Sequence, residues 1–233
     1  MLTGKEFVAK LAKENEPLFK AGELQIKAYY EKNEGNKEEL IDNFTGRMVN
    51  ERMNMEEISR EVAALPAGTD PEKTILLTKQ AHDEAKHFQF VKEVVEHLTG
   101  KPIDMEKAVE SHAGQQDKKG AHRIKKYNCN ENPLMLAVYQ YVAEGSAARN
   151  WQMMADIIED QFIADRYGKI AKDEGFHATI GEMELAKLCD DQAAQDEIND
   201  MINDFRKDLF QVTCAKSGML PETQKIMEDA YGA

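Results

Sequence analysis

The chain has 233 residues, which is enough for one domain with a sizeable hydrophobic core. Its formal net charge of −13 opposes electrostatic binding to nucleic acid or to an anionic membrane surface. The three cysteines include no Cys-x-x-Cys pair, which argues against a disulfide framework and against an iron–thiolate module. The sequence shows no apolar signal core and no apolar run of membrane-spanning length. We therefore expect a cytoplasmic protein with reduced thiols.

Helical periodicity covers most of the chain, and strand alternation is almost absent, so we expect an all-α protein. The main helices are expected over about 4–32 (one helix, or two with a break near Pro17), 36–65, 71–99, 133–157, 161–189 and 193–216. Pro and Gly residues at 66–71 mark a strong turn, and a short helix is expected after Pro221. Residues 103–131, which include a Lys-rich run at 118–126, form a long crossover with room for one short helix.

The five-residue motif Asp-Glu-x-x-His occurs twice, at residues 83–87 and again at 173–177. Residues three apart share one face of a helix, so the Glu of each motif points the same way as its His. A carboxylate and an imidazole at this spacing can serve as two ligands for one metal ion. The predicted ligand pairs are Glu84 with His87, and Glu174 with His177.

Two further glutamates interrupt the apolar stripes of neighbouring helices. Glu51 fills the only gap in the stripe of the helix at 36–65, between Met48 and Met55. Glu144 occupies the equivalent inward position in the helix that follows Pro133. The rival glutamates lie off the first stripe or at a predicted turn: Glu56, Glu57 and Glu159.

Four buried glutamates would be too costly as bare anions. Two divalent cations balance four carboxylates charge for charge, and two neutral imidazoles complete the ligand set. Glu51 and Glu84 are 33 residues apart around the turn at 66–71, and Glu144 and Glu174 are 30 apart around a turn that we place at 158–160. Each pair is therefore expected to lie level in a helical hairpin. The two hairpins and the crossover between them predict a four-helix bundle with its ligands at one depth.

This pattern resembles the ferritin-like di-iron carboxylate superfamily, in which two Glu and two Glu-x-x-His motifs on four helices hold two metal ions. The resemblance covers about residues 36–189. It implies an all-α, ferritin-like four-helix bundle with one long crossover and extra N- and C-terminal helices, in a single domain over 1–233. The metal ligands that it implies are Glu51, Glu84, His87, Glu144, Glu174 and His177.

The resemblance also implies roles for neighbouring side chains. Asp83 and Asp173 would each accept a hydrogen bond from the ligand His of the other motif and so fix the imidazole tautomer. Solvent-exposed aspartates are the alternative. Tyr141 and Tyr167 are candidates for a redox or pocket role, although we expect ordinary core packing for both. Small inner-stripe residues such as Gly181 leave open a substrate cavity or close helix packing.

The doubled motif is similar to that of oxygen-activating di-iron enzymes, so we expect an O2-activating di-iron oxidase or monooxygenase that acts on a small or fatty organic substrate. No catalytic residue is expected beyond the metal ligands. The expected cofactor is two iron ions, and manganese or a mixed manganese–iron pair fits the same ligands. A ferredoxin or reductase is the expected electron donor because the chain shows no flavin or nicotinamide motif. A homodimer stays open.

Two other functions stay open at this point. One is a ferroxidase, peroxidase or iron-binding protein without an organic substrate. The other is a metal-free helical interaction module.

Overall fold

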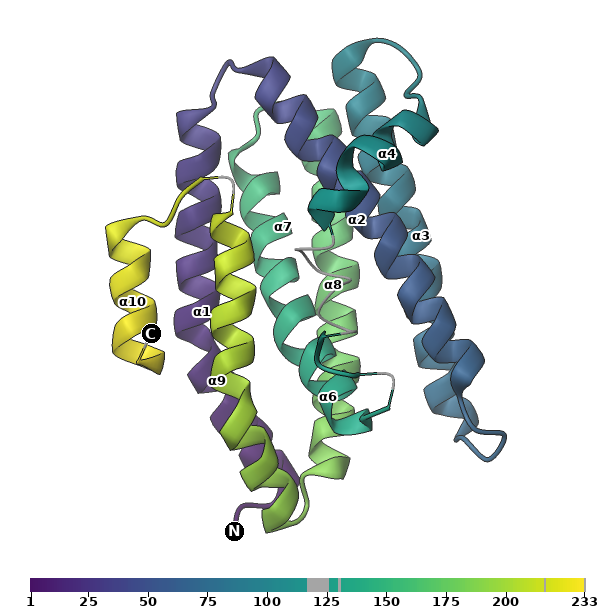
Figure 1. The fold of residues 1–233 in the computed structure, drawn as a ribbon, viewed down its shortest axis with the longest axis vertical. Helices are drawn as coiled ribbons and strands as arrows, with labels where there is room; N and C mark the ends of the chain where they lie inside the picture. The colour runs from purple at the N-terminus through teal and green to yellow at the C-terminus, as the bar shows by residue number, and fades with distance from the viewer. Residues whose placement is uncertain (117–125, 130, 216, 233) are drawn as a thin grey trace. The chain divides into compact units, whose positions relative to one another are not determined.

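The computed structural model of the protein describes residues 1–116, 126–129, 131–215 and 217–232. Nearly all of these residues are helical and none of them forms a strand (Figure 1), so the all-α prediction is confirmed. No helix in the described part of the chain is long and apolar enough to cross a membrane. The Lys-rich run predicted at 118–126 lies outside the described residues, except for Lys126.

The chain divides into two compact units. Unit 1 contains Met1–Lys32, Asn132–Glu159 and Tyr167–Ala233. Unit 2 contains Asn33–Glu131 and Asp160–Arg166. The expectation of a single domain over 1–233 stays a prediction.

Unit 2 is built on a hairpin of two long helices, α2 (Lys37–Ala64) and α3 (Pro71–Thr99), which pack along each other (Figure 1). The Asp70 side chain accepts a hydrogen bond of 3.0 Å from the Glu72 backbone N–H and so caps α3, which begins with Pro71. Gly100 ends α3 with a positive φ of 69°, a conformation that glycine adopts without strain. These boundaries confirm the predicted turn and the predicted end of the helix.

The described part of the crossover contributes the short helix α4 (Met105–Gln116) to unit 2, and a short helix was predicted in this segment. This helix packs on α2. His112 of α4 is buried, and its Nε2 lies 3.0 Å from Asp42 Oδ1 of α2. His112 therefore attaches the crossover to the hairpin.

The helices of unit 1 are α1 (Gly4–Lys32), α6 (Pro133–Val138), the π-helix η1 (Tyr139–Glu144), α7 (Gly145–Ile157), most of α8 (Gln161–Leu188), α9 (Gln192–Cys214) and α10 (Pro221–Tyr231). The turn between α7 and α8 lies at residues 158–160, where the sequence analysis placed it. The helix predicted at 193–216 is confirmed within two residues at each end, and a short helix follows from Pro221 as expected.

Helix α1 continues through Pro17, so the break that was considered at this residue is absent. Proline removes one backbone donor and crowds the preceding turn. The hydroxyl of Tyr231 lies at this point: it accepts a hydrogen bond from Leu18 N (3.1 Å) and donates one to Glu14 O (2.6 Å). Leu18 N–H and Glu14 C=O are the two groups that pair directly in an uninterrupted helix. The tyrosine therefore satisfies the helix backbone beside the proline, and the buried face of α1 remains continuous.

Gly181 of α8 marks a close contact between helices within unit 1. A Cβ atom at this position would lie 2.4 Å from Tyr141 N and 2.7 Å from Ala137 O. Of the two alternatives left open by the sequence, Gly181 therefore serves close helix packing.

Candidate metal centre

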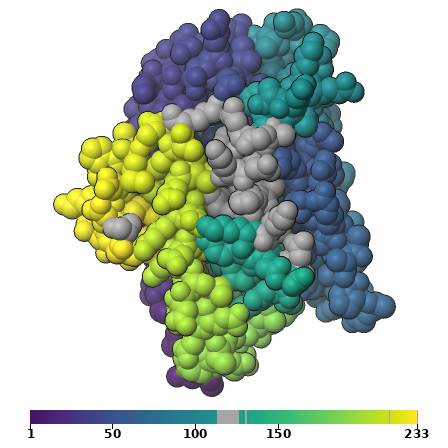
Figure 2. Space-filling view, in the orientation of Figure 1, coloured from purple at the N-terminus to yellow at the C-terminus, as the bar shows by residue number. Residues whose placement is uncertain are grey.

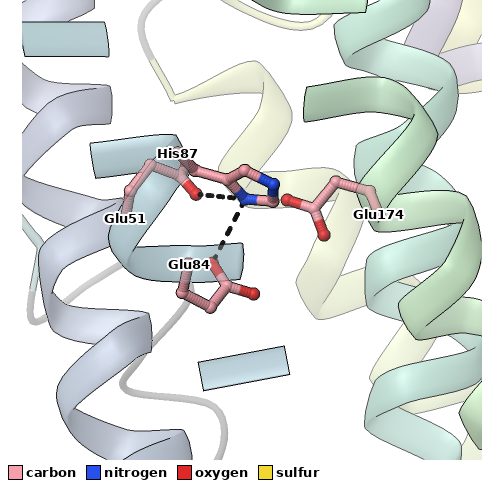
Figure 3. Close-up of side chains that lie close together, drawn as sticks. All are labelled: Glu51, Glu84, His87 and Glu174. Carbon is pink, nitrogen blue, oxygen red and sulfur yellow. Dashed lines mark ion pairs between the residues drawn. The ribbon is translucent and has the colours of Figure 1, made fainter. Parts of the chain in front are cut away.

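Three of the six predicted ligands come together within unit 2. Glu51 on α2 is 3% exposed, and Glu84 and His87 on α3 are fully buried. Each of these residues offers a ligand atom within 4.8 Å of the other two. His87 Nδ1 lies 3.7 Å from Glu51 Oε2 and 3.6 Å from Glu84 Oε2, as the dashed lines in Figure 3 show. We call this group the α2–α3 triad.

The hairpin itself positions the α2–α3 triad. Glu51 follows Met48 along the buried face of α2, and Glu84 and His87 lie between the buried residues Leu77 and Val91 of α3. Because the turn at 66–70 lies midway between Glu51 and Glu84, the two carboxylates reach the same level of the hairpin. The apolar residues above and below them exclude water from the triad.

The other three predicted ligands come together within unit 1. Glu144 is the last residue of η1, and Glu174 and His177 lie on α8; their exposed fractions are 4%, 2% and 0%. Their candidate ligand atoms again lie within 4.8 Å of one another. His177 Nδ1 lies 3.1 Å from Glu174 Oε2. We call this group the η1–α8 triad; Figure 3 also draws Glu174, one of its members.

The π-helix before Glu144 is a feature that the sequence analysis missed. Periodicity predicted a regular α-helix with Tyr141 on its inner stripe, but the segment widens to a π-helix over Tyr139–Glu144. Tyr139 and Gln140 are buried there, while Tyr141 is only half-buried. Single π-turns are rare and occur often at functional sites. Here the π-helix ends at Glu144, one of the candidate metal ligands.

The spacing within the triads suits metal ligands. The distances of 3.6 and 3.7 Å around His87 are too long for hydrogen bonds. Two ligand atoms that each lie about 2.1 Å from one ion are separated by about 3.0–3.4 Å. The 3.1 Å distance at His177 falls in this range, and those at His87 lie slightly above it. Each triad could hold a metal ion through two carboxylates and one imidazole.

The two aspartates of the motifs differ in their surroundings. Asp83 is buried, with 2% of its surface exposed, so the solvent-exposed alternative is wrong for this residue. Its carboxylate accepts hydrogen bonds from Lys79 Nζ and, at 3.0 Å, from Lys86 Nζ. Asp173 is half-buried. The pairing of each aspartate with the histidine of the other motif would run between the units and stays a prediction.

The two tyrosine candidates both pack within unit 1. Tyr167 is fully buried, and its ring meets that of Trp151 edge-on, with 4.8 Å between centroids. The Tyr141 hydroxyl is 3.5 Å from Val8 O, and burial together with the charge of Glu182 raises the pKa of Tyr141 to about 12. Core packing, the role expected for both, fits these surroundings.

Glu61 of α2 is a buried carboxylate that the sequence analysis did not single out. It is 5% exposed, and burial and the nearby Glu57 raise its pKa above the ordinary value. Helical periodicity of the apolar residues places Val62 on the buried face of this helix, but Val62 is only half-buried. The pKa of the Cys129 thiol is raised to about 12, mainly by burial and to a smaller extent by the charge of Glu61. Glu61 therefore lies near Cys129 at the end of the crossover and belongs to neither triad.

Comparisons of the chain with protein-family models, with curated proteins and with solved structures gave no match. The functional assignment therefore depends on the residues of the two triads and their surroundings.

Proposed function

We propose that the two triads together bind two divalent metal ions and that the protein is an O2-activating di-iron oxidase or oxygenase. In this proposal the triads face each other inside a ferritin-like four-helix bundle formed by α2, α3, the α6–α7 segment and α8. The observation that carries the proposal is the burial of four carboxylates and two imidazoles, with exposed fractions of 0–4%, in two groups of the same composition.

Charge supports the presence of metal. With neutral histidines, each triad carries two negative charges in surroundings where an unpaired charge is strongly destabilising. One divalent cation per triad neutralises these charges. Carboxylate and imidazole ligands suit iron and manganese, and three protein ligands per ion leave coordination positions open. Bound Fe(II) would supply the electrons that reduce O2.

In this proposal the residues of the chain bind the metal ions, orient the ligands and shield the site from water. His87 Nδ1 lies near Glu51 and Glu84, and His177 Nδ1 lies near Glu174, which supports Nδ1 as the proposed ligand atom of each histidine. Lys79 and Lys86 hold the Asp83 carboxylate in place beside Glu84. A water-excluded site strengthens electrostatic interactions within it and protects reactive species from solvent. The proposed substrate is a small or fatty organic molecule, with a ferredoxin or reductase as electron donor.

Metal analysis with matched glutamate variants tests the proposal. The wild-type protein, loaded with Fe(II) without oxygen and then desalted, is expected to retain two ions per chain. Glu51→Ala and Glu174→Ala are expected to lose metal because each removes a ligand. The matched controls Glu57→Ala, on the same helix as Glu51, and Glu159→Ala, at the turn before α8, are expected to retain two ions. Two ions in all five proteins would contradict the assignment of the ligands.

Oxygen consumption separates the functions left open by the sequence. A di-iron oxygenase consumes O2 over many turnovers only when a reductant is supplied, and an organic substrate accelerates the reaction. Stoichiometric oxidation of added Fe(II), with ferric iron retained in a large cage, would favour iron handling instead. A chain that binds no metal would favour the helical interaction module.

A further inference from the structure

A cleft in unit 1 that is lined by none of the triad residues has a chemistry that the proposed function does not use. It has a volume of about 430 Å³ and lies between α1, α9 and α10. Figure 2 shows α9 and α10 side by side on this face of the molecule. Pro17, Ile202 and Tyr231 form apolar parts of its wall, and Lys10 and Arg206 contribute positive charge.

Arg206 is the most unusual residue of this cleft. Its side chain is among the largest that are fully buried, with 1% of the residue exposed. Nε and Nη2 donate hydrogen bonds of 2.8 and 2.6 Å to Asn15 Oδ1, and Nη1 donates one of 2.8 Å to Asn203 Oδ1. Both acceptors are neutral amides. Because a guanidinium has five N–H donors, two of them have no hydrogen-bonded acceptor among the described residues.

The negative charge of Glu14 does not fully balance the positive charge of Arg206. Glu14 Oε2 lies 3.7 Å from Arg206 Nη2, beyond hydrogen-bonding distance, and Glu14 Oε1 lies 3.5 Å from Lys10 Nζ. Glu14 is thus shared between two cations. The cleft lining carries two positive charges and one negative charge, although the chain as a whole has a net charge of −13.

A second donor beside the guanidinium also lacks an acceptor. Asn15 is fully buried, and its Nδ2 has no hydrogen-bond partner in the described part of the chain. Buried donors and buried charges of this kind are normally satisfied. An anion in the cleft could accept hydrogen bonds from Arg206, and a planar carboxylate matches the fork of the guanidinium.

We propose that this cleft binds a small organic carboxylate, with its carboxylate group between Lys10 and Arg206 and its apolar part against Pro17 and Tyr231. No candidate metal ligand lines the cleft, so the proposal holds whether or not the triads bind metal. The apolar wall favours an aromatic or short aliphatic acid over an inorganic anion.

Binding of benzoate and hexanoate tests the proposal, with benzamide as the neutral analogue of benzoate. Titration calorimetry on the full chain, with a chelator present so that no metal can take the carboxylate, is expected to show saturable binding of a carboxylate. Benzamide is expected to bind at least about tenfold more weakly, because the bond to Arg206 is charge-assisted. Absence of binding by both acids, or equal binding of benzoate and benzamide, would overturn the proposal.

Two variants and one matched control locate the site. Asn203→Asp places a carboxylate 2.8 Å from Arg206 Nη1, so this folded variant is expected to lose at least about tenfold in benzoate affinity. Lys10→Met is expected to weaken binding roughly two- to fivefold, the effect of one partly exposed charge. Lys27→Met is the control, because Lys27 forms a similar i,i+4 pair with Glu31 on α1 but does not line the cleft. Unchanged binding by Asn203→Asp would place the ligand elsewhere and refute the assignment.

Discussion

Two buried glutamates of α2, Glu51 and Glu61, differ in the groups that surround their carboxylates. Glu51 belongs to a triad with Glu84 and His87, where a cation can neutralise it. Glu61, three turns later, faces Cys129 and belongs to neither triad. Burial and Glu57 raise the pKa of Glu61, so the fold favours its neutral form. The fold thus favours the protonated form of Glu61, whereas metal binding by Glu51 requires the deprotonated form.

The raised pKa of Glu61 predicts a pH-dependent effect of Glu61→Gln. Because the folded-state pKa lies above the ordinary 4.5, the stabilising contribution of the neutral carboxyl is full below pH 4.5 and is lost as the pH rises through the folded-state value. Glutamine stays neutral throughout. Urea unfolding of the metal-free protein at pH 7.5 is therefore expected to show the variant more stable by about 0.5–1 kcal/mol, with little difference at pH 4.5. Glu159→Gln, at an exposed turn, is the control, and an equal gain at both pH values would contradict the assignment.

The sequence predicted the triad residues but not Glu61, and the difference has a physical reason. Glu51, Glu84 and Glu174 interrupt otherwise apolar stripes, so a charge in the core was visible from periodicity alone. After Ile58, a step of three residues reaches Glu61 and a step of four reaches Val62, and both continue a helical stripe. The apolar Val62 was therefore predicted to be the buried residue. Glu61 is buried instead, and its charge acts on Cys129 at the end of the crossover. These two residues are far apart in the chain, so a local pattern does not reveal that they lie near each other.

At the scale of secondary-structure elements, helix ends were predicted well because capping residues determine them. Asn36, Asp70 and Asn132 each accept hydrogen bonds from the first turn of a helix, and Gly100 ends another. The interiors of two helices were less predictable. The π-helix at Tyr139–Glu144 lies within an apolar run that gives no periodic sign of an extra residue. The continuity of α1 through Pro17 depends on a residue more than two hundred positions away.

A double-mutant cycle tests the role of Tyr231 in α1. Tyr231→Phe removes the hydroxyl that bonds Leu18 N and Glu14 O, and is expected to destabilise the protein by about 1–2 kcal/mol. In a Pro17→Ala background these two backbone groups can pair directly, so the same substitution is expected to cost less than about 0.5 kcal/mol. Chemical denaturation of the four proteins measures both values. Equal effects in the two backgrounds would show that the hydroxyl does not compensate for the proline.

Two glycines of α8 provide a matched test of helix packing. Gly181→Ala is expected to destabilise the protein by about 3 kcal/mol, because the new Cβ would lie 2.4 Å from the Tyr141 backbone nitrogen. Gly168→Ala is expected to stabilise it by about 0.5–1 kcal/mol, since nothing lies within 4 Å of a Cβ there and alanine favours the helix. Thermal unfolding should therefore shift in opposite directions. A neutral Gly181→Ala would refute the close packing of α8 against the segment from α6 to η1.

At the scale of the whole molecule, each unit supplies one complete triad. Unit 2 contains Glu51, Glu84 and His87, and unit 1 contains Glu144, Glu174 and His177. The sequence predicted these two sets because residues at equal distances from a turn lie level with each other in a helical hairpin. How the two sets are used together depends on contacts between distant parts of the chain, for which the spacing rule gives no information. The proposed di-metal centre requires that they act as one site.

Metal-dependent stability distinguishes one shared site from two separate ones. Ligands that bind only the folded state stabilise it by about 2.7 kcal/mol when the free ligand is at a hundred times its Kd, which for a chain of this size raises Tm by roughly 5–10 °C. Calorimetry of the apo protein with added Mn(II), which needs no exclusion of oxygen, is expected to show such a shift. The shift should shrink toward low pH because the carboxylate and imidazole ligands must lose their protons to bind. If the triads form one centre, Glu51→Ala and Glu144→Ala are each expected to abolish most of the shift, although each removes a ligand from only one triad. Retention of about half of the shift in each variant would indicate two independent mononuclear sites and would rule out the di-metal chemistry proposed for this chain.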